Sequence, residues 1–284
     1  MKRLIFCADD FGLDPAVNEA VEQAHRNGIL STASLMVGGP AAADAVARAR
    51  RMPGLRVGLH LDLVDGAPLL PPAEISGLVG ADGRFRSNMG LAGVRFFFLP
   101  RVRRQLAREI RAQFEAFRAT GLQLDHVNGH KHIQLHPTVA RLVVEIGRDY
   151  GLRAVRLPAE PVPVLRRAFP RERYGPVLYR PAIAALRRRL RRAGLRANDH
   201  VFGIAWSGNM VERRVLALLP YVPDGVSEIY FHPASARTPG LIAAMPDYRH
   251  SEELHALTSA SVRRRVAELG IELTSYTDLA AVPG

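Results

Sequence analysis

The chain has 284 residues, of which 48% are apolar, so it can bury a full core as one large domain or as two smaller ones. Its single cysteine, Cys7, excludes an internal disulfide framework and a cysteine-based zinc cluster. No apolar run reaches the roughly 18 residues of a membrane span, and acids at positions 9 and 10 precede any apolar segment long enough for a signal peptide. We therefore expect a cytoplasmic protein.

The formal net charge of +12 comes from arginine, because every basic residue except Lys2 and Lys131 is an arginine. Residues 163–196 hold eleven arginines and one acid, Glu172. Within them, apolar residues at helical spacing predict a basic amphipathic helix around residues 181–193, which is typical of contact with an anionic membrane or a nucleic acid. A solvated helix face is the alternative. Nucleic acid is disfavoured, because basic residues are not interleaved with aromatic ones.

Apolar runs alternate with amphipathic stretches along the whole chain, which indicates strand–helix units and a parallel sheet. The expected strands lie near residues 3–8, 31–37, 55–61, 122–127, 152–156, 200–206, 227–231 and 270–275. The expected helices lie near residues 14–27, 41–52, 101–120, 136–149, 181–193, 210–219 and 252–268. Seven or eight such units favour an α/β fold of the distorted TIM-like (β/α) barrel type over an open sheet.

Two segments interrupt the repeat, so we expect one barrel domain over residues 1–284 with insertions at about 62–100 and 159–199. The first insertion ends in three consecutive aromatic residues, Phe96, Phe97 and Phe98, beside several arginines. They could begin a core helix, or they could form an apolar, basic-edged flap at the mouth of a site. The second insertion carries the arginine-rich helix.

Polar side chains capable of chemistry stand at the ends of the expected strands. They are Asp9 and Asp10 after the first strand, His60 after the third, His130 after the fourth, Arg156 after the fifth and His232 after the seventh. In a closed barrel these ends converge on the C-terminal rim. One carboxylate and two imidazoles with an open position are typical of a catalytic divalent-metal site. The alternative for the acidic pair is that Asp10 or Asp14 only caps the following helix.

These residues carry a resemblance to the YdjC/ChbG family of carbohydrate deacetylases. It rests on residues 8–12 (ADDFG), 58–60 (GLH), 130–132 (HKH), 156–158 (RLP) and 228–233 (EIYFHP). The resemblance implies a distorted barrel. It also implies a hydrolase acting on carbon–nitrogen bonds, which removes acetyl groups from N-acetylated sugars with a divalent metal. It implies Asp10, His60 and His130 as metal ligands, Asp9 as general base and His232 as general acid. Arg156 is our candidate for tuning the charge of Asp9.

Relatives in that family often have a histidine where this chain has Gln134, which leaves the roles of His126, His132 and His136 open. An Asp-His-His set suits zinc, while Mg²⁺, Mn²⁺ or Co²⁺ remain alternatives.

Within the family the chain resembles most a branch associated with hopanoid biosynthesis, called HpnK. This rests on residues 102–107 (VRRQLA), 113–118 (QFEAFR), 124–132 (LDHVNGHKH) and 203–210 (GIAWSGNM). The branch implies an N-acetylglucosaminyl hopanoid as substrate. We then expect peripheral contact with the anionic inner membrane through Phe96, Phe97, Phe98 and the helix at Arg187–Arg192.

Two alternatives differ in class. A deacetylase of soluble N-acetyl sugars such as chitooligosaccharides would have the same site. A non-catalytic sugar- or metal-binding barrel would need neither the base Asp9 nor the acid His232, so their presence argues against it.

Overall fold

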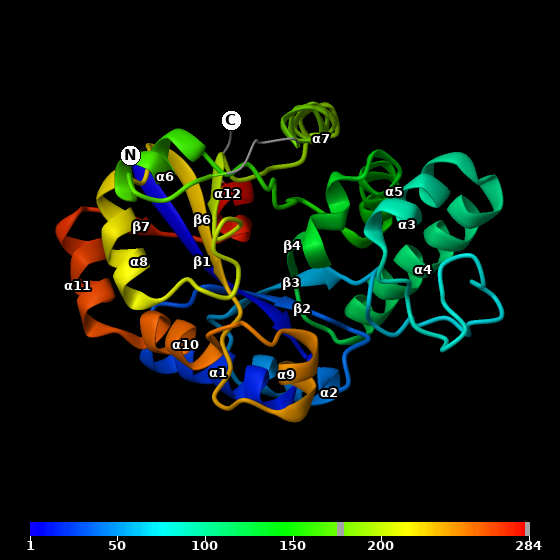
Figure 1. Ribbon diagram of the computed structural model, residues 1–284, viewed down its shortest axis with the longest axis horizontal. Coiled ribbons are helices and arrows are strands. Elements are labelled where there is room, and N and C mark those ends of the chain that lie inside the picture. The colour runs from blue at the N-terminus through cyan, green and yellow to red at the C-terminus, as the bar shows by residue number, and fades with distance from the viewer. Residues whose placement is uncertain (175–178, 282–284) are drawn as a thin grey trace.

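The computed structural model describes residues 1–174 and 179–281, and a curled sheet of parallel strands lies at its centre (Figure 1). The strands run in the order β4-β3-β2-β1-β6-β5, and β7 pairs with β1. Their bounds are β1 Lys2–Phe11, β2 Thr32–Leu35, β3 Arg56–Leu61, β4 Leu124–Gly129, β5 His200–Phe202, β6 Gly225–Phe231 and β7 Glu272–Leu273. All pairings are parallel, so the carboxyl ends of the strands lie on one rim.

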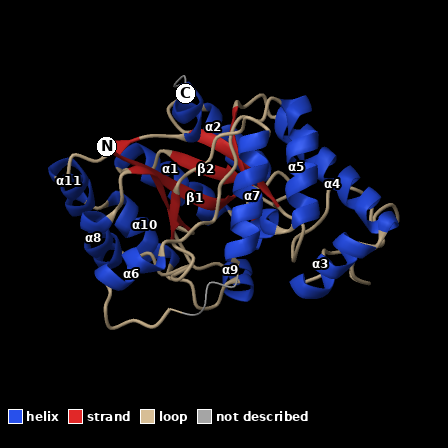
Figure 2. Ribbon diagram, turned by 90° about the horizontal axis from the view of Figure 1, so that it is seen from above, coloured by secondary structure: helices blue, strands red, loops and turns tan. Residues whose placement is uncertain are grey.

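Helices surround the sheet in both views (Figures 1 and 2). They are α1 Pro15–Asn27, α2 Ala42–Arg50, α3 Met89–Phe98, α4 Pro100–Ala119, α5 Pro137–Gly147, α6 Val162–Ala168, α7 Arg180–Arg192, α8 Glu212–Leu218, α9 Pro239–Ala244, α10 His250–Thr258, α11 Ala260–Glu268 and α12 Tyr276–Ala281. A short 3-10 helix, η1 His130–Leu135, follows β4 directly. No helix among the described residues is long and apolar enough to cross a membrane.

The expected fifth strand, residues 152–156, is wrong as a regular strand. Val155 bridges Val127 of β4, and Ala154 bridges Arg196, but no longer ladder forms. The side-chain amide of Asn198 bonds both the N–H and the carbonyl of Leu157, at 2.7 and 2.8 Å, in the place of a neighbouring strand. Pro158 follows and has no N–H to donate. Isolated bridges rather than a ladder thus follow β4, and the curled sheet forms a half-barrel that is consistent with a distorted TIM-like barrel.

The expected helix at 252–268 is two helices. Ser259 stands between α10 and α11 with an extended backbone, and its Oγ accepts the N–H groups of Ser261 and Val262. This is an N-cap, which ends one helical path and starts another. The other six expected helices are present as α1, α2, α4, α5, α7 and α8, with small differences at their ends.

The two insertions each place one helix against α5. The first ends in α3, whose buried Ala92 and Phe96 face the protein while Phe97 and Phe98 are exposed. The second contains α7, whose buried Leu186 and Leu190 pack towards α5. Both α3 and α7 thus pack against α5, and Figure 2 shows α3 at the edge of the molecule.

Alternate residues of each strand face the inside of the barrel. On β1, Leu4, Phe6 and Ala8 join the large core beneath the helices, whereas Ile5 and Cys7 join a small inner cluster. Tyr276 of α12 belongs to that inner cluster and fills the barrel from its N-terminal end. The alternation directs a defined set of side chains inward at the rim.

Candidate metal and catalytic site

The inward positions of the strands are polar towards the carboxyl end. They comprise Asp9 on β1, Ser34 on β2, His60 on β3, His126 and Asn128 on β4, and Glu228 on β6, and all are buried. Asp10 would point outward by strict alternation. Its backbone has a φ of 62° and the pairing with β2 shifts register here, so two adjacent carboxylates both turn to the rim. A positive φ in a residue other than glycine is strained and often marks a functional site.

Three potential metal ligands meet at this rim. Oδ1 of Asp10 lies 3.3 Å from Nε2 of His60 and 3.4 Å from Nδ1 of His130. The ligand atoms of the three residues all lie within 4.8 Å of one another. Ligand atoms about 2.1 Å from a tetrahedral zinc are about 3.4 Å apart. The spacing around Asp10 therefore fits such an ion.

The tautomer of His60 is set by its neighbour Asn128. The Asn128 amide donates through Nδ2 to Asp9 at 3.1 Å and to Ser34 at 2.9 Å. Because the Asp9 carboxylate only accepts hydrogen bonds, the amide orientation is fixed. Its Oδ1 then accepts the Nδ1–H of His60, 2.8 Å away. Nε2 of His60 is left with a lone pair directed at Asp10, as metal-binding imidazoles require.

Asp10 itself lacks hydrogen-bond donors. Both of its carboxylate oxygens are buried and accept no hydrogen bond from any described residue. A buried carboxylate facing a bare imidazole nitrogen is unfavourable unless a cation lies between them. Burial opposes protonation of His130, yet the Asp10 carboxylate outweighs it and raises the pKa of His130 to about 9, so this position favours a positive charge beside Asp10. The residues present therefore fit a metal ion.

The second carboxylate, Asp9, is held by Arg156. This buried guanidinium donates to both oxygens of Asp9 and, through Nε, to Glu228 at 2.9 Å. Burial alone would raise the pKa of Asp9, but Arg156 lowers it below its usual range. With Asp10, the group contains three buried carboxylates and one guanidinium, a formal charge of −2. A divalent cation would neutralise it.

His232 follows β6, the strand that pairs with β1. Glu253 accepts its backbone N–H, and its carbonyl accepts Nδ1–H of His250 at 2.6 Å. The rings of Tyr230 and Tyr248 pack on either side, with centroids 5.5 and 5.0 Å from that of His232. Nδ1 of His232 has no partner among the described residues, and burial lowers the pKa of the imidazole. The backbone is fixed while the ring keeps a free polar atom.

The three remaining histidines of this region lie in different surroundings. His126 is buried between Asp125 and Ser34, at 2.9 and 3.1 Å, and stacks on Tyr276. The Nε2 of His132 lies 3.3 Å from the hydroxyl of Tyr230. Burial lowers the pKa of His132 to about 3. His136 packs edge-on against Phe96 of α3, 5.7 Å between centroids, so it joins the first insertion to η1.

The sequence reasoning missed three residues of the network. Asn128 orients His60, Glu228 shares Arg156 with Asp9, and Asp62 follows His60 two residues on, where burial raises its pKa to about 6. Strand alternation from His60, His130 and His232 could have indicated all three.

The helix-cap alternative applies to Asp14, whose Oδ1 accepts the N–H of Ala16 at 2.8 Å at the start of α1. Asp10 does not cap that helix.

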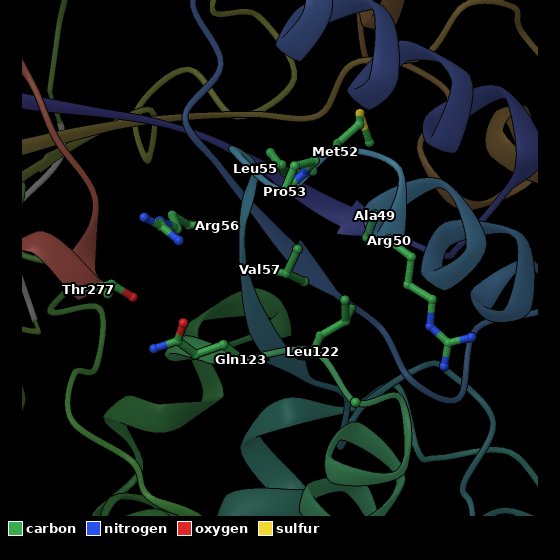
Figure 3. A pocket seen from close by; sticks show the side chains of 11 residues that line it. Ala49, Arg50, Met52, Pro53, Leu55, Arg56, Val57, Leu122, Gln123 and Thr277 are labelled. Carbon is green, nitrogen blue, oxygen red and sulfur yellow. The ribbon is translucent and has the colours of Figure 1, made fainter.

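A cavity of about 220 Å³ lies at the opposite end of the barrel (Figure 3). It is lined by the starts of β3 and β4, including Arg56 and Gln123, and by Thr277 of α12. None of the site residues borders it.

The fold is that of known proteins. A crystal structure from Enterococcus faecalis V583, provisionally described as a cellobiose-phosphate cleavage protein, superposes with a TM-score of 0.75 over 98% of both chains at 24% identity. A family model described as YdjC-like protein matches residues 3–268. The chain therefore belongs to the YdjC-like family.

Curated relatives are similar over nearly their whole length. The carbohydrate deacetylase of Mus musculus is 33% identical over 98% of this chain and 94% of its own. The carbohydrate deacetylases of Vibrio vulnificus (strain CMCP6) and Geobacillus stearothermophilus are 31% and 30% identical, covering 99% and 95% of this chain and 98% and 95% of theirs.

Proposed function

We propose that this protein is a metal-dependent N-deacetylase that hydrolyses the amide of an N-acetylglucosaminyl group. The observation that carries the proposal is the buried Asp10 carboxylate, which lacks hydrogen-bond donors and faces His60 and His130 beside the Asp9–Arg156 pair. The relatives named carbohydrate deacetylase support a hydrolase acting on carbon–nitrogen bonds.

Asp10, His60 and His130 would hold the metal, and zinc suits their spacing best. When bound, the ion supplies a Lewis acid that polarises the acetyl carbonyl and lowers the pKa of water. Asp9 would accept the proton of the attacking water. Arg156 keeps Asp9 ionised and fixes its orientation through two hydrogen bonds.

His232 would donate a proton to the leaving amine nitrogen. Because burial lowers the pKa of its imidazole, the protonated ring is a stronger acid than a solvent-exposed histidine. Glu253 and His250 hold the backbone of His232, so the ring is presented at the carboxyl end of β6, the strand that pairs with β1.

For the natural substrate we propose an N-acetylglucosaminyl hopanoid, deacetylated to the glucosaminyl form during hopanoid biosynthesis at the inner membrane. The support is the resemblance of four segments to the hopanoid-associated branch, at residues 102–107, 113–118, 124–132 and 203–210. A protein at the cytoplasmic surface would reach this lipid without crossing the bilayer.

The test measures acetate released from N-acetylglucosaminyl hopanoid in vesicles and, separately, from chitobiose, using zinc-loaded protein of measured metal content. We expect release from the lipid, and its loss in Asp10→Ala with retention in the matched control Asp14→Ala. Release from chitobiose alone would favour the soluble-sugar alternative. Release from neither, with metal bound, would leave a non-catalytic binding barrel.

A further inference from the structure

The outer side of α3 is apolar. Its members Leu91, Val94, Phe97 and Phe98, with Leu99 at the C-cap, are 44% to 67% exposed. Among the described residues these five make up nearly half of the exposed large hydrophobic side chains, although they span only nine positions. An outward helix face is normally charged or polar. We call these five residues the α3 ridge.

The ridge is held in place from the other side. Phe96 is 2% exposed and packs against His136, and Ala92 is buried one turn earlier. This corrects the expectation that Phe96 belongs to a membrane contact, because, of the three phenylalanines, only Phe97 and Phe98 reach the surface. Asn88 caps the helix by accepting the N–H of Leu91 at 2.9 Å. The helix therefore cannot turn its exposed phenylalanines inward without losing this packing.

Positive charge surrounds the ridge. Residues 83–108 contain seven arginines and no acid. Within the described chain, Arg95, Arg101, Arg103 and Arg104 form no ion pair, and Arg101 and Arg104 are exposed. Exposed aromatic and aliphatic side chains flanked by arginines match the interface of a bilayer with anionic headgroups.

The helix that carries the ridge contacts the segment that follows the rim. Phe96, on the inner side of the same helix, contacts His136, the residue after η1, and η1 begins with His130. The arginine-rich α7 packs on α5 as α3 does, but Leu186 and Leu190 fill its apolar face against the protein. It can add positive charge near a membrane, but it cannot insert.

We propose that the α3 ridge is a docking surface for an anionic lipid bilayer, with the phenylalanines Phe97 and Phe98 in the headgroup region and the neighbouring arginines on the lipid phosphates. Docking would bring the rim close to sugar headgroups that stand out from the bilayer, a role that rests on the proposed deacetylase function. The binding itself is independent of catalysis.

The experiment is sedimentation of the full-length protein with sucrose-loaded vesicles, either of phosphatidylcholine alone or with phosphatidylglycerol. We expect binding to the anionic vesicles, and a decrease of about tenfold or more in the double variant Phe97→Ser/Phe98→Ser. Ile242→Ser on α9 is the matched control, because this side chain is 45% exposed but lies outside the ridge, and it should bind as wild type. Arg101→Glu/Arg104→Glu should lower binding to the anionic vesicles.

Catalysis is measured apart from docking. The Phe97→Ser/Phe98→Ser variant should release acetate from soluble chitobiose at the wild-type rate but lose most of its rate on lipid in vesicles. Asp10→Ala should bind vesicles as wild type. Equal vesicle binding of wild type and the phenylalanine variant would overturn the proposal. So would a wild-type dimer, seen by light scattering, that this variant dissociates, because the ridge would then be covered by a second copy.

Discussion

Single residues decide whether Asp10 binds a cation or only caps a helix. Replacing Asp10 by Asn removes the one charged ligand while conserving shape, so we expect Zn²⁺ binding to be abolished in calorimetry and in metal content after gel filtration. Asp14→Asn changes a carboxylate that caps α1 four residues away. It should keep full metal content. Equal metal content in wild type and Asp10→Asn would refute the ligand assignment.

Asn128 tests whether the orientation of His60 matters for the proposed metal binding. If Oδ1 of Asn128 is removed, Nδ1–H of His60 loses the acceptor that fixes the tautomer of the ring. We expect Asn128→Ala to weaken zinc affinity about 10- to 100-fold in competition titrations with a chelator. Ser34→Ala removes only one of the bonds that hold the Asn128 amide and should have a much smaller effect. Similar losses in both variants would mean that general packing, not His60 orientation, matters.

The sequence indicated the candidate ligands more clearly than the residues that surround them. Asp9, Asp10, His60, His130, Arg156 and His232 could be found because ionisable residues at strand ends are unusual, and the structure brings them to one rim. Asn128 was not predicted because an amide side chain within a strand has no charge that sets it apart, although strand alternation from His130 includes it. Its role depends on the pairing of β3 with β4, which places it opposite His60. Glu228 pairs with Arg156 across 72 positions of sequence, so alternation can place Glu228 on the inner face of its strand but only the fold reveals its partner.

At the scale of elements, predictions were reliable where periodicity was regular and poor where side chains replaced the backbone ladder. Six of the seven expected helices are present, while the seventh is divided by the cap at Ser259. The sequence of residues 152–156 is typical of a strand, but the structure has no regular strand there. The backbone N–H and carbonyl of Leu157, the next residue, bond to the side-chain amide of Asn198 instead of to a strand, and sequence composition cannot predict such a contact.

The contribution of Glu160 to the stability of a loop can be tested by its pH dependence. Its carboxylate accepts the N–H groups of Gly203, Ile204 and Ala205 and so holds the loop after β5. Burial raises the pKa of Glu160 from its ordinary 4.5 to about 7, although these N–H groups oppose the rise. The folded state then binds the proton more tightly than the unfolded state. The stability that Glu160 contributes is full below about pH 4.5 and is lost as pH rises through 7.

The measurement compares wild type with Glu160→Gln in urea unfolding from pH 4.5 to 8, because the difference cancels the other titrating groups. We expect the free energy of unfolding of wild type to fall relative to the variant by about 2 to 3 kcal/mol across this range. A pH-independent difference would contradict the raised pKa. Glu19→Gln, on the exposed side of α1, serves as the control substitution and should show no such trend.

For the molecule as a whole, the parallel strands and surrounding helices followed from the alternation of apolar runs. The direction in which the insertions fold could not follow from it, because it depends on contacts such as Phe96 with His136 and Leu190 with the core. Amphipathic sequence alone did not distinguish α3, whose apolar outer side is exposed, from α7, whose apolar side is buried.

The proposed metal would offset the buried formal charge of −2 and so would stabilise the whole fold. Asp9, Asp10 and Glu228 outnumber Arg156, and the paired strands β1 and β6 carry them. Zinc at 100 times its dissociation constant should stabilise the fold by about 2.7 kcal/mol, which corresponds to a rise of about 5 to 10 °C in Tm. Scanning calorimetry with zinc and with a chelator measures this increment. It should vanish in Asp10→Asn; an unchanged metal response in that variant would place the ion elsewhere.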